Sequence, residues 1–347
     1  MSAPAHGPGT PPPAFEVLTM GRVGVDVYPL QVGVPLRKVT SFGRYLGGSP
    51  TNVAVAAARL GRSSAVITRT GADPFGEFVH DALAEYGVDD RYVTAVPHLP
   101  TPVTFCEIRP PDDFPLYFYR HPKAPDLEIL PEELDLPAVT ASALFWATVT
   151  GLSAEPSLGA HLAAWRARGR ARHTVLDLDY RPMFWPDAET ARERVRAALG
   201  QVTVAVGNLD EAEVATGTRD PHAAGRALLD AGVELAIIKQ GAAGVLGMTA
   251  DTTVEVPPVE VEVVNGLGAG DAFGGALCHG LLAGWPLART LRFANAAGAI
   301  VAGRLACAPA MPTAEEIEAV LAGGSPDSPA GSPDSPAGSQ RGGVTDA

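Results

Sequence analysis

The chain has 347 residues, 46% of them hydrophobic, which is enough for one large α/β domain or two ordinary ones with a substantial core. Its formal net charge of −13 at pH 7 argues against nucleic acid or an anionic membrane as the main partner, because both are bound through Lys and Arg. An anionic small substrate is compatible with this charge, since a local positive site can lie on an acidic protein.

The N-terminal residues 1–13 are rich in Pro, Gly and Ala, and we expect them to be disordered. They lack the apolar segment of a signal peptide, and no apolar run in the chain reaches the roughly 18 residues of a membrane span. Cys106, Cys278 and Cys307 are far apart and odd in number, which favours free thiols over a disulfide framework or a zinc site. We therefore expect a soluble, cytoplasmic protein.

From residue 15 onward, strand patterns alternate with helix patterns, which predicts βαβ units and a mostly parallel sheet covered on both faces. The predicted strands are FEVLTMGRV (15–23), SSAVITRTG (63–71), ALFWATVTG (143–151), HTVLDLDY (173–180), VTVAVGN (202–208) and ELAIIKQG (234–241). The predicted helices are 49–61, with a capping signal at Ser49 or Thr51, then 73–87, 155–169, 221–232, 269–284, 287–303 and 313–323.

Two β-prone stretches, 26–46 and 101–121, interrupt this alternation and are predicted to be hairpins that pair into a small β lid. Ligands of open α/β sheets lie at the carboxyl ends of the strands, where such a lid would exclude water. An exposed lid can also pair with the lid of a second copy, so we expect a homodimer through the β lid. Residues 324–347 contain the repeat GSPDSPA and are predicted to be a disordered tail, which leaves 14–323 as one domain.

The stretch NGLGAGD (265–271) opens a predicted helix with a glycine-rich turn. Backbone N–H groups at such a turn point one way and meet the positive end of the helix dipole, which suits a phosphoryl group. Asp271 in the first helical turn is placed to accept a proton from an attacking hydroxyl. An ordinary helix start, with Asp271 as a favourable charge, explains the stretch equally well. It is neither a Walker A loop nor a Rossmann fingerprint.

The stretch GGSPTN (47–52) places two glycines before a helix whose first turn presents Asn52. Small residues let a substrate approach the backbone, and an amide can bind sugar hydroxyls. On its own, the stretch is also typical of an ordinary loop and helix cap.

Taken together, these stretches resemble the ribokinase-like (PfkB-type) carbohydrate kinases over roughly residues 15–322. The motifs that support the resemblance are Met20-Gly21 followed by Asp26, GGSPTN, NLDE (208–211), KQGAAG (239–244), GAGD (268–271) and ANAAGAIV (294–301). The resemblance implies a ribokinase-like three-layer α/β/α fold with a small β lid. It also implies a kinase, a phosphotransferase with an alcohol acceptor, that uses ATP and Mg²⁺ to phosphorylate a small sugar or sugar acid.

The resemblance further implies roles for individual residues. Asp271 would be the catalytic base, and the backbone of Gly268, Ala269 and Gly270 would be the anion hole. Substrate hydroxyls would be bound by Asp26, Gly47, Gly48 and Asn52. The nucleotide would be contacted by Lys239, Gly241, Gly244 and Asn295. Asn208 and Glu211 match a family pattern linked to Mg²⁺ and phosphate through water, although a helix cap and a solvated charge explain them on sequence alone.

The chain departs from the family's frequent DTxGAGD motif, because Asn265 and Gly266 replace the Asp and Thr. A charge and a hydroxyl beside the nucleotide phosphates are lost, which leaves the dependence on nucleotide and on a monovalent cation such as K⁺ open. The change also allows a catalytically silent sugar-acid or nucleotide sensor. A nicotinamide dehydrogenase is a further alternative, but the early GxGxxG of that class is missing.

Cationic and aromatic residues near the expected ligand site favour an anionic sugar. Arg181, in LDLDYRPMFW (176–185) with Asp179, Tyr180 and Trp185, offers a planar fork suited to a carboxylate. Similar groups are Tyr119, Arg120 and Lys123 in FYRHPKAP, and Arg44 and Tyr45 in FGRYLGGSP. The alternative is that these arginines only pair with surface carboxylates.

FGRYLGGSPTNVA, LDYRPMFW and APAMPTAEEIEA resemble the 5-dehydro-2-deoxygluconokinases of myo-inositol catabolism. The resemblance implies phosphorylation of the terminal 6-hydroxyl of 5-dehydro-2-deoxy-D-gluconate. The 2-keto-3-deoxygluconate kinases share the YR and RP features and are the alternative.

Overall fold

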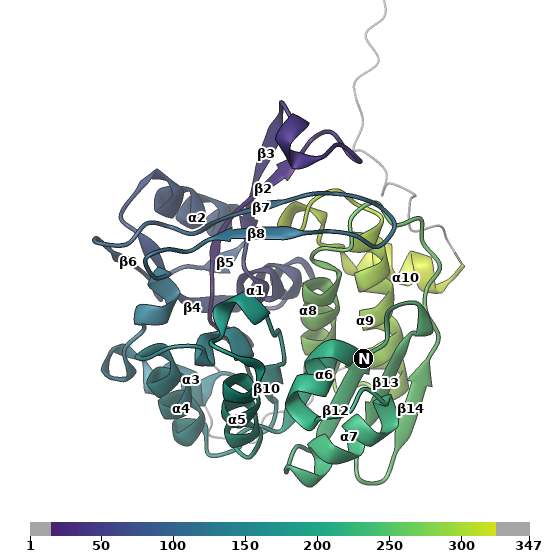
Figure 1. Ribbon diagram of the computed structural model, residues 1–347. Coiled ribbons are helices and arrows are strands. Elements are labelled where there is room, and N and C mark those ends of the chain that lie inside the picture. Colours follow the sequence, from purple (N-terminus) through teal and green to yellow (C-terminus); the bar gives the residue numbers. More distant parts are fainter. Residues whose placement is uncertain (1–14, 324–347) are drawn as a thin grey trace, which may run out of the picture.

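The computed structural model describes residues 15–323, so the disorder expected for 1–13 and 324–347 lies outside the described residues. A central sheet runs through the molecule (Figure 1). Its strands are β1 (Val17–Met20), β4 (Ser64–Gly71), β5 (Val88–Asp89), β6 (Val93–Val96), β9 (Leu144–Thr148), β10 (Thr174–Asp177), β11 (Val204–Asn208), β12 (Leu235–Lys239), β13 (Val245–Met248) and β14 (Thr253–Val256).

The strand order is β14-β13-β12-β11-β10-β9-β1-β4-β5, and β6 also pairs with β4. Pairing is parallel except between β12, β13 and β14, so the predicted mostly parallel sheet is confirmed. In parallel strands the carboxyl ends meet at one edge of the sheet. Side chains that follow β1, β10, β11 and β12 therefore lie close to one another.

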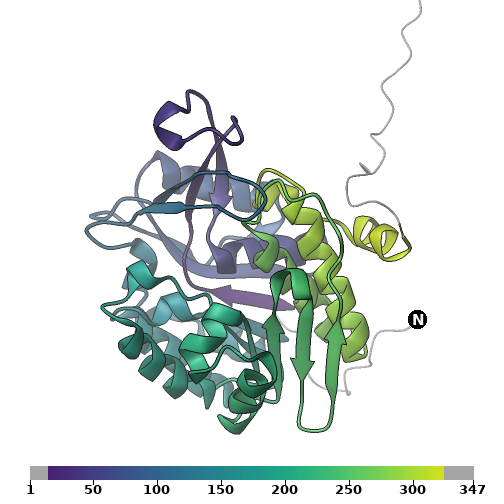
Figure 2. The ribbon, with the colours of Figure 1, turned by 45° about the vertical axis from the view of Figure 1, so that its right-hand side comes forward.

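Helices cover both faces of the sheet, as Figure 2 shows with teal helices on one side and yellow-green helices on the other. Val17 packs into one apolar layer and its neighbour Leu18 into the other, because side chains alternate along a strand. The first layer contains α1 (Ser49–Arg59), α2 (Pro74–Glu85), α8 (Ala269–Leu282), α9 (Leu287–Ala302) and α10 (Ala314–Leu321). The second contains α3 (Leu136–Ala141), α4 (Ser157–Arg168), α5 (Ala188–Leu199), α6 (Leu209–Thr216) and α7 (Pro221–Asp230). The expected three-layer α/β/α arrangement is confirmed.

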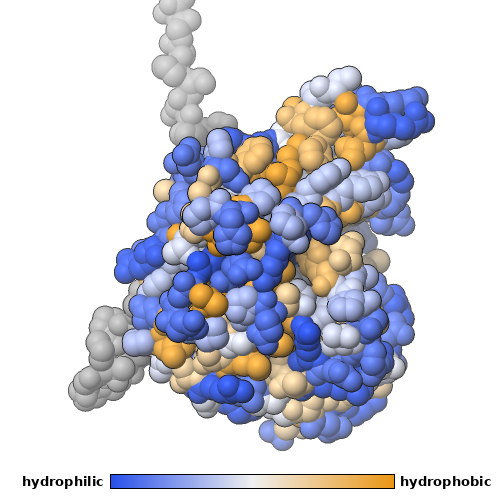
Figure 3. Space-filling model, turned by 60° about the vertical axis from the view of Figure 1, so that its left-hand side comes forward, coloured by the Kyte–Doolittle hydropathy of each residue, from blue (hydrophilic) through white to orange (hydrophobic). Residues whose placement is uncertain are grey.

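A separate four-stranded sheet projects from the end of the molecule where β1 finishes (Figure 1). It consists of β2 (Gly24–Pro29), β3 (Phe42–Gly47), β7 (Val103–Cys106) and β8 (Leu116–Tyr119). β2–β3 and β7–β8 are antiparallel hairpins, and β2 and β7 join them in parallel. The two predicted hairpins therefore do pair into one small sheet, which we call the lid. Figure 3 shows hydrophobic surface on this projecting part.

Short 3₁₀ helices complete the chain. They are η1 (Leu36–Lys38), η2 (Pro125–Glu128), η3 (Pro131–Glu133), η4 (Val149–Leu152), η5 (Pro182–Phe184), η6 (Gly241–Ala243) and η7 (Ala308–Ala310). Cys106, Cys278 and Cys307 are buried free thiols. Among residues 15–323, no helix is long and apolar enough to cross a membrane.

The predicted cap of α1 was wrong. Gly48, not Ser49 or Thr51, is the N-cap, and no side chain caps the helix. Gly48 has a φ of 104°, and a Cβ there would lie 2.4 Å from the carbonyl oxygen of Arg22. The chain therefore needs glycine at this position to turn from the lid into α1.

Candidate active site

A cavity of about 210 Å³ lies between the lid, the carboxyl ends of the central strands and the start of α8. Its walls include many of the residues predicted from the sequence, namely Asp26, Gly48, Asn52, Arg181, Asn208, Glu211, Lys239, Gly268, Gly270 and Asp271. A second cavity, of about 430 Å³, is lined by Tyr92, Ile129 and Leu134 among others and contains none of the predicted site residues. The smaller cavity is therefore the candidate site.

The start of α8 forms one wall of this site. Gly268 is the N-cap with a φ of 83°, and no side chain caps the helix. The N–H groups of the first turn have no intrahelical partner, so they are left for a ligand. Asp271 lies in that turn, as the glycine-rich stretch predicts. The turn can bind an anion next to a carboxylate.

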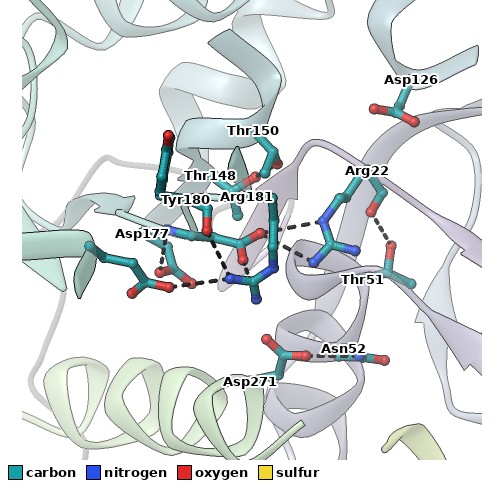
Figure 4. A network of polar contacts seen from close by, with 12 residues as sticks. Arg22, Thr51, Asn52, Asp126, Thr148, Thr150, Asp177, Tyr180, Arg181 and Asp271 are labelled. Carbon is teal, nitrogen blue, oxygen red and sulfur yellow. Dashed lines mark hydrogen bonds and ion pairs between the residues drawn. The ribbon is translucent and has the colours of Figure 1, made fainter. Parts of the chain in front are cut away.

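Asp271 is held by a neighbouring helix. The Asn52 Nδ2 of α1 donates to the Asp271 Oδ2 at 2.8 Å, as Figure 4 shows. Burial raises the pKa of Asp271, while hydrogen bonds from Asn52 and Ser49 lower it. A buried carboxylate with a raised pKa suits a general base. The Asn52 Oδ1 is buried and has no partner among the described residues, so it is free to accept from a ligand hydroxyl.

Asp26 enters the site from the lid. Burial raises its pKa to about 6, although Arg22 and a hydrogen bond from Tyr28 lower it. The Tyr28 Oη lies 3.1 Å from the Asp26 carboxylate and 2.8 Å from the Cys307 Sγ. A Cβ at Gly47 would lie 2.3 Å from the Asp26 carboxyl group, so Gly47 makes room for that side chain. Gly47 thus supports the site without lining the cavity.

Asp179 lies between two arginines. The Arg22 Nε and Nη2 donate to the Asp179 Oδ2 at 3.3 and 3.2 Å, and the Arg181 Nη2 lies 2.7 Å from Oδ1. Burial raises the pKa of Asp179, but the charges of Arg181 and Arg22 lower it by more, so that it lies below its ordinary value. The Arg181 Nη1 also lies 3.5 Å from Glu211. Arg181 therefore pairs with protein carboxylates, but these are buried in the site and not at the surface.

Lys239, at the end of β12, reaches the anion-binding turn. A Cβ at Gly270 would lie 3.2 Å from the Lys239 Nζ, so the ammonium lies against the first turn of α8. Burial lowers the pKa of Lys239, but Asp177, Glu211 and the other carboxylates raise it above its ordinary value. Burial raises the pKa of Asp177. The site thus holds a charged ammonium among acidic groups.

Asn208 and Glu211 cap α6 reciprocally. The Asn208 Oδ1 accepts from the Glu211 N–H at 2.9 Å, and the Glu211 carboxylate accepts from the Asn208 N–H at 2.8 Å. The helix-cap interpretation is therefore correct, but Glu211 is only 5% exposed and is not a solvated charge. Both residues also line the cavity. Within residues 15–323, no group of three or more His, Cys, Asp or Glu side chains is arranged to hold a metal ion.

Tyr119 and Arg120 do not lie in the cavity, so their predicted placement is corrected. The lid register pairs Asp26 with Thr104 and Thr104 with Phe118, which puts Phe118 on the inner face. Tyr119 alternates to the outer face and is 65% exposed. Arg120 binds both oxygens of buried Asp126, at 3.0 and 2.9 Å.

Residues predicted for the nucleotide side have local structural roles. Gly244 has a φ of 89°, and a Cβ there would lie 2.1 Å from the Val256 carbonyl oxygen. Gly241 opens η6 in the same β12–β13 turn, with a φ of 56°. The Asn295 Nδ2 donates to the Pro257 carbonyl at 2.8 Å. These three residues and Ala269 are not among those that line the cavity.

Several cavity residues have no counterpart in the predicted set. The alternation of side chains along the lid strand LYFY (116–119) could have predicted that Leu116 and Phe118 point inward. Arg22 directly follows the Met20-Gly21 pair, but its identity alone does not indicate a role. The others are Tyr28, Ser49, Thr104, Asp177, Gly266, Leu267 and Cys307.

Comparison with known proteins gives consistent matches. The model of the pfkB family of carbohydrate kinases matches residues 14–314. The chain is 31% identical over 313 residues to the 5-dehydro-2-deoxygluconokinase of Clostridium beijerinckii, covering 87% of this chain and 91% of the relative. It is 30% identical over 312 residues to that of Shouchella clausii, covering 88% and 95%. A putative ribokinase II from E. coli, in complex with ATP and Mg²⁺, has a TM-score of 0.80 at 24% identity over 88% of this chain and 99% of its own.

Proposed function

Because this chain belongs to the pfkB family of carbohydrate kinases and is a sugar phosphotransferase, we propose that its substrate is 5-dehydro-2-deoxy-D-gluconate, phosphorylated on the terminal 6-hydroxyl by ATP. The observation that most supports the reaction is Asp271, held by Asn52 beside the uncapped start of α8. The choice of a sugar acid is supported by the two arginines around Asp179 and by the names of the similar proteins.

In the proposed mechanism, the terminal hydroxyl of the sugar lies between Asp271 and the start of α8. Asp271 accepts the hydroxyl proton as the oxygen attacks the γ-phosphorus of ATP. The N–H groups of residues 268–270 and the Lys239 ammonium stabilise the charge on the transferring phosphoryl group. The free Asn52 Oδ1 and the Asp26 carboxylate bind other hydroxyls, and the lid excludes water.

Mg²⁺ would neutralise charge on the phosphates of bound ATP. The residues that fit it best are Asn208 and Glu211, whose side chains line the cavity. One Glu211 oxygen is occupied in the α6 cap and the other faces Arg181, so we propose that both residues reach the ion through water.

Asn265 does not fit a bound monovalent cation. Asn265 is fully buried, its Nδ2 donates to the Leu305 carbonyl at 2.7 Å, and its Oδ1 accepts from the Leu267 N–H at 3.1 Å. Both polar ends of the amide are used, and it brings no negative charge. We therefore expect equal turnover in K⁺ and in tetramethylammonium at matched ionic strength, measured as ADP release. Loss of turnover on removal of K⁺ would contradict this, and N265D is the variant expected to gain a response.

Replacing Asn52 with alanine is expected to move the acid limb of the kcat/KM profile to higher pH. The Asn52 hydrogen bond favours ionised Asp271, so its loss raises the pKa of a base that must be deprotonated. Activity at low pH then falls earlier than in the wild type. S49A should shift the limb in the same direction but less, because the Ser49 bond lowers the pKa by less. An unchanged limb in N52A would argue that Asp271 is not the group that titrates.

We further propose that two copies associate through their lids. The outer face of the lid exposes Phe42, Tyr117 and Tyr119, which are 39%, 41% and 65% exposed. Phe105 packs edge to face with both Phe42 and Tyr119, so the patch is a continuous aromatic surface. Sedimentation should show a dimer for the wild type and a monomer for Y119K. L321K, which alters an exposed apolar residue on α10, should remain dimeric, and a monomeric wild type would refute the proposal.

The proposed substrate is tested by incubating the protein with MgATP and 5-dehydro-2-deoxygluconate and examining the product by ³¹P and ¹H NMR. The expected product has phosphorus coupled to the protons of the terminal carbon. A product formed only from 2-keto-3-deoxygluconate would replace the substrate but keep the reaction. Binding without any phosphorylated product would instead favour the sensor alternative.

A further inference from the structure

Arg22 occupies the junction between β1 and the lid and lines the cavity. Its side chain is 11% exposed, and its Nε and Nη2 both donate to the Asp179 Oδ2. Within residues 15–323 no hydrogen bond from its third nitrogen, Nη1, is found. A guanidinium group has five N–H donors, so Arg22 has unused donors on the side away from Asp179.

Arg22 has fewer direct carboxylate partners than Arg181. One carboxylate lies between two guanidinium groups, and the low pKa of Asp179 keeps that carboxylate ionised. Arg181 has a second carboxylate partner, Glu211 at 3.5 Å. Asp179 is the only ion-pair partner of Arg22 in the described part of the chain. Arg22 therefore has one direct carboxylate partner where Arg181 has two.

Arg22 lines the same cavity as Asp26 and Asp271. Its charge lowers the pKa of both Asp26 on the lid and Asp271 at the start of α8. In Figure 4 the Arg22 guanidinium group points toward the side of the network where Arg181 lies. Asp26 and Asp271 both repel an anion, whereas Arg22, which lines the same cavity, attracts one.

The lid covers Arg22 with an aromatic ring. The Arg22 guanidinium carbon lies 5.9 Å from the centre of the Phe118 ring, on the inner face of β8. Phe118 packs edge to face on Phe184 of η5, with ring centres 4.9 Å apart. A planar guanidinium fixed by Asp179 and covered by an apolar ring is preorganised, and a charge-assisted bond is stronger where water is excluded.

We propose that Arg22 determines the specificity for an acid by donating from Nη1 to the carboxylate of the sugar, while Asp179 holds its orientation. Arg181 directs its Nη1 and Nη2 to Glu211, the Tyr180 carbonyl and Asp179, while its Nε is buried without a partner among the described residues. It therefore supports Asp179 from the other side. This inference rests on the proposed sugar-acid kinase function. It assigns the contact with the acid to a residue next to the first strand instead of to Arg181.

The test compares kcat/KM for 5-dehydro-2-deoxygluconate with that for its primary amide, which is neutral and nearly isosteric. In R22Q the preference for the acid should fall by about 10–100-fold, since a hydrogen bond to a charged group is lost. The value for the amide and the KM for MgATP should change little, because glutamine keeps an N–H for Asp179. R22K should retain part of the preference. R219Q, which removes an exposed arginine of the α6–α7 connection, should behave as the wild type.

The outcomes distinguish the proposed function from the inference about Arg22. A wild type that prefers the acid, with the same preference in R22Q, would overturn the inference and leave the proposed function intact. A wild type without any preference would overturn the acid substrate and the inference together. If R22Q does not fold, as judged by loss of MgATP binding, R22K decides: a reduced preference supports the inference, and an unchanged preference overturns it.

Discussion

Replacing Asp271 with asparagine is expected to lower kcat by about 10²–10⁴-fold while sugar and MgATP binding are largely kept. The change removes the proton acceptor but conserves the size of the side chain. The Asn52 Nδ2, which donates to Asp271 at 2.8 Å, can donate equally to the amide oxygen of the variant. The geometry of the site should therefore be kept, so that kcat falls while the binding of sugar and MgATP changes little. Steady-state kinetics and equilibrium titration with sugar and nucleotide measure the two quantities separately.

Asp220→Asn is the matched control, because Asp220 is also an aspartate at a helix start but caps α7 outside the cavity. It should leave kcat unchanged. Turnover of D271N close to that of the wild type would remove Asp271 from the role of base. A rise in KM at constant kcat would assign it to substrate binding instead.

Replacing Gly268 with alanine is expected to lower kcat by about 10²–10³-fold, the usual cost of losing an anion-hole donor. Gly268 has a φ of 83°, a conformation that costs an alanine strain. The added Cβ would also lie 2.6 Å from the Cys307 Sγ and 2.8 Å from its Cβ, so the turn or residue 307 must move. The N–H groups at the start of α8 then no longer point at the transferring phosphoryl group. Pre-steady-state measurement of the chemical step reports this loss directly.

Gly284→Ala is the control that separates the effect of backbone strain from the effect of misplaced N–H groups. Gly284 follows the other end of α8 with a φ of 65° and has no atom within 4 Å of an added Cβ. It should lose some stability and no activity. Adding C307G to G268A should recover part of the rate, because the contact with residue 307 is then removed. Full activity of G268A alone would show that the turn does not form the anion hole.

Much of the fold could be predicted from the sequence because the signals are local. Buried runs such as FEVLTMGRV and Gly- or Pro-marked helices such as 73–87 have their periodicity within one segment. Helix α5 was missed because only four of its twelve residues are buried, which leaves a narrow apolar stripe. The β13–β14 hairpin was missed because strands of four residues give too short a pattern.

The candidate site was predictable where a residue's role depends on the backbone around it. Gly268 and Asp271 belong to one turn, and the sequence places both. The partners of Arg22, Arg181 and Arg120 depend on contacts between segments far apart in the chain, such as the 157 positions that separate Arg22 from Asp179. Tyr119 was assigned to the wrong face of the lid, because a one-residue step along a strand moves a side chain to the opposite face.

The most direct test of the central claim, that this kinase recognises a sugar acid, is kcat/KM for ADP release from MgATP across a panel of acceptors. The panel contains 5-dehydro-2-deoxygluconate, 2-keto-3-deoxygluconate, gluconate, fructose, ribose and adenosine. The account predicts a large preference for 5-dehydro-2-deoxygluconate over the neutral sugars and adenosine. A preference for fructose, ribose or adenosine would contradict it and would leave Arg22, Asp179 and Arg181 as a purely structural cluster.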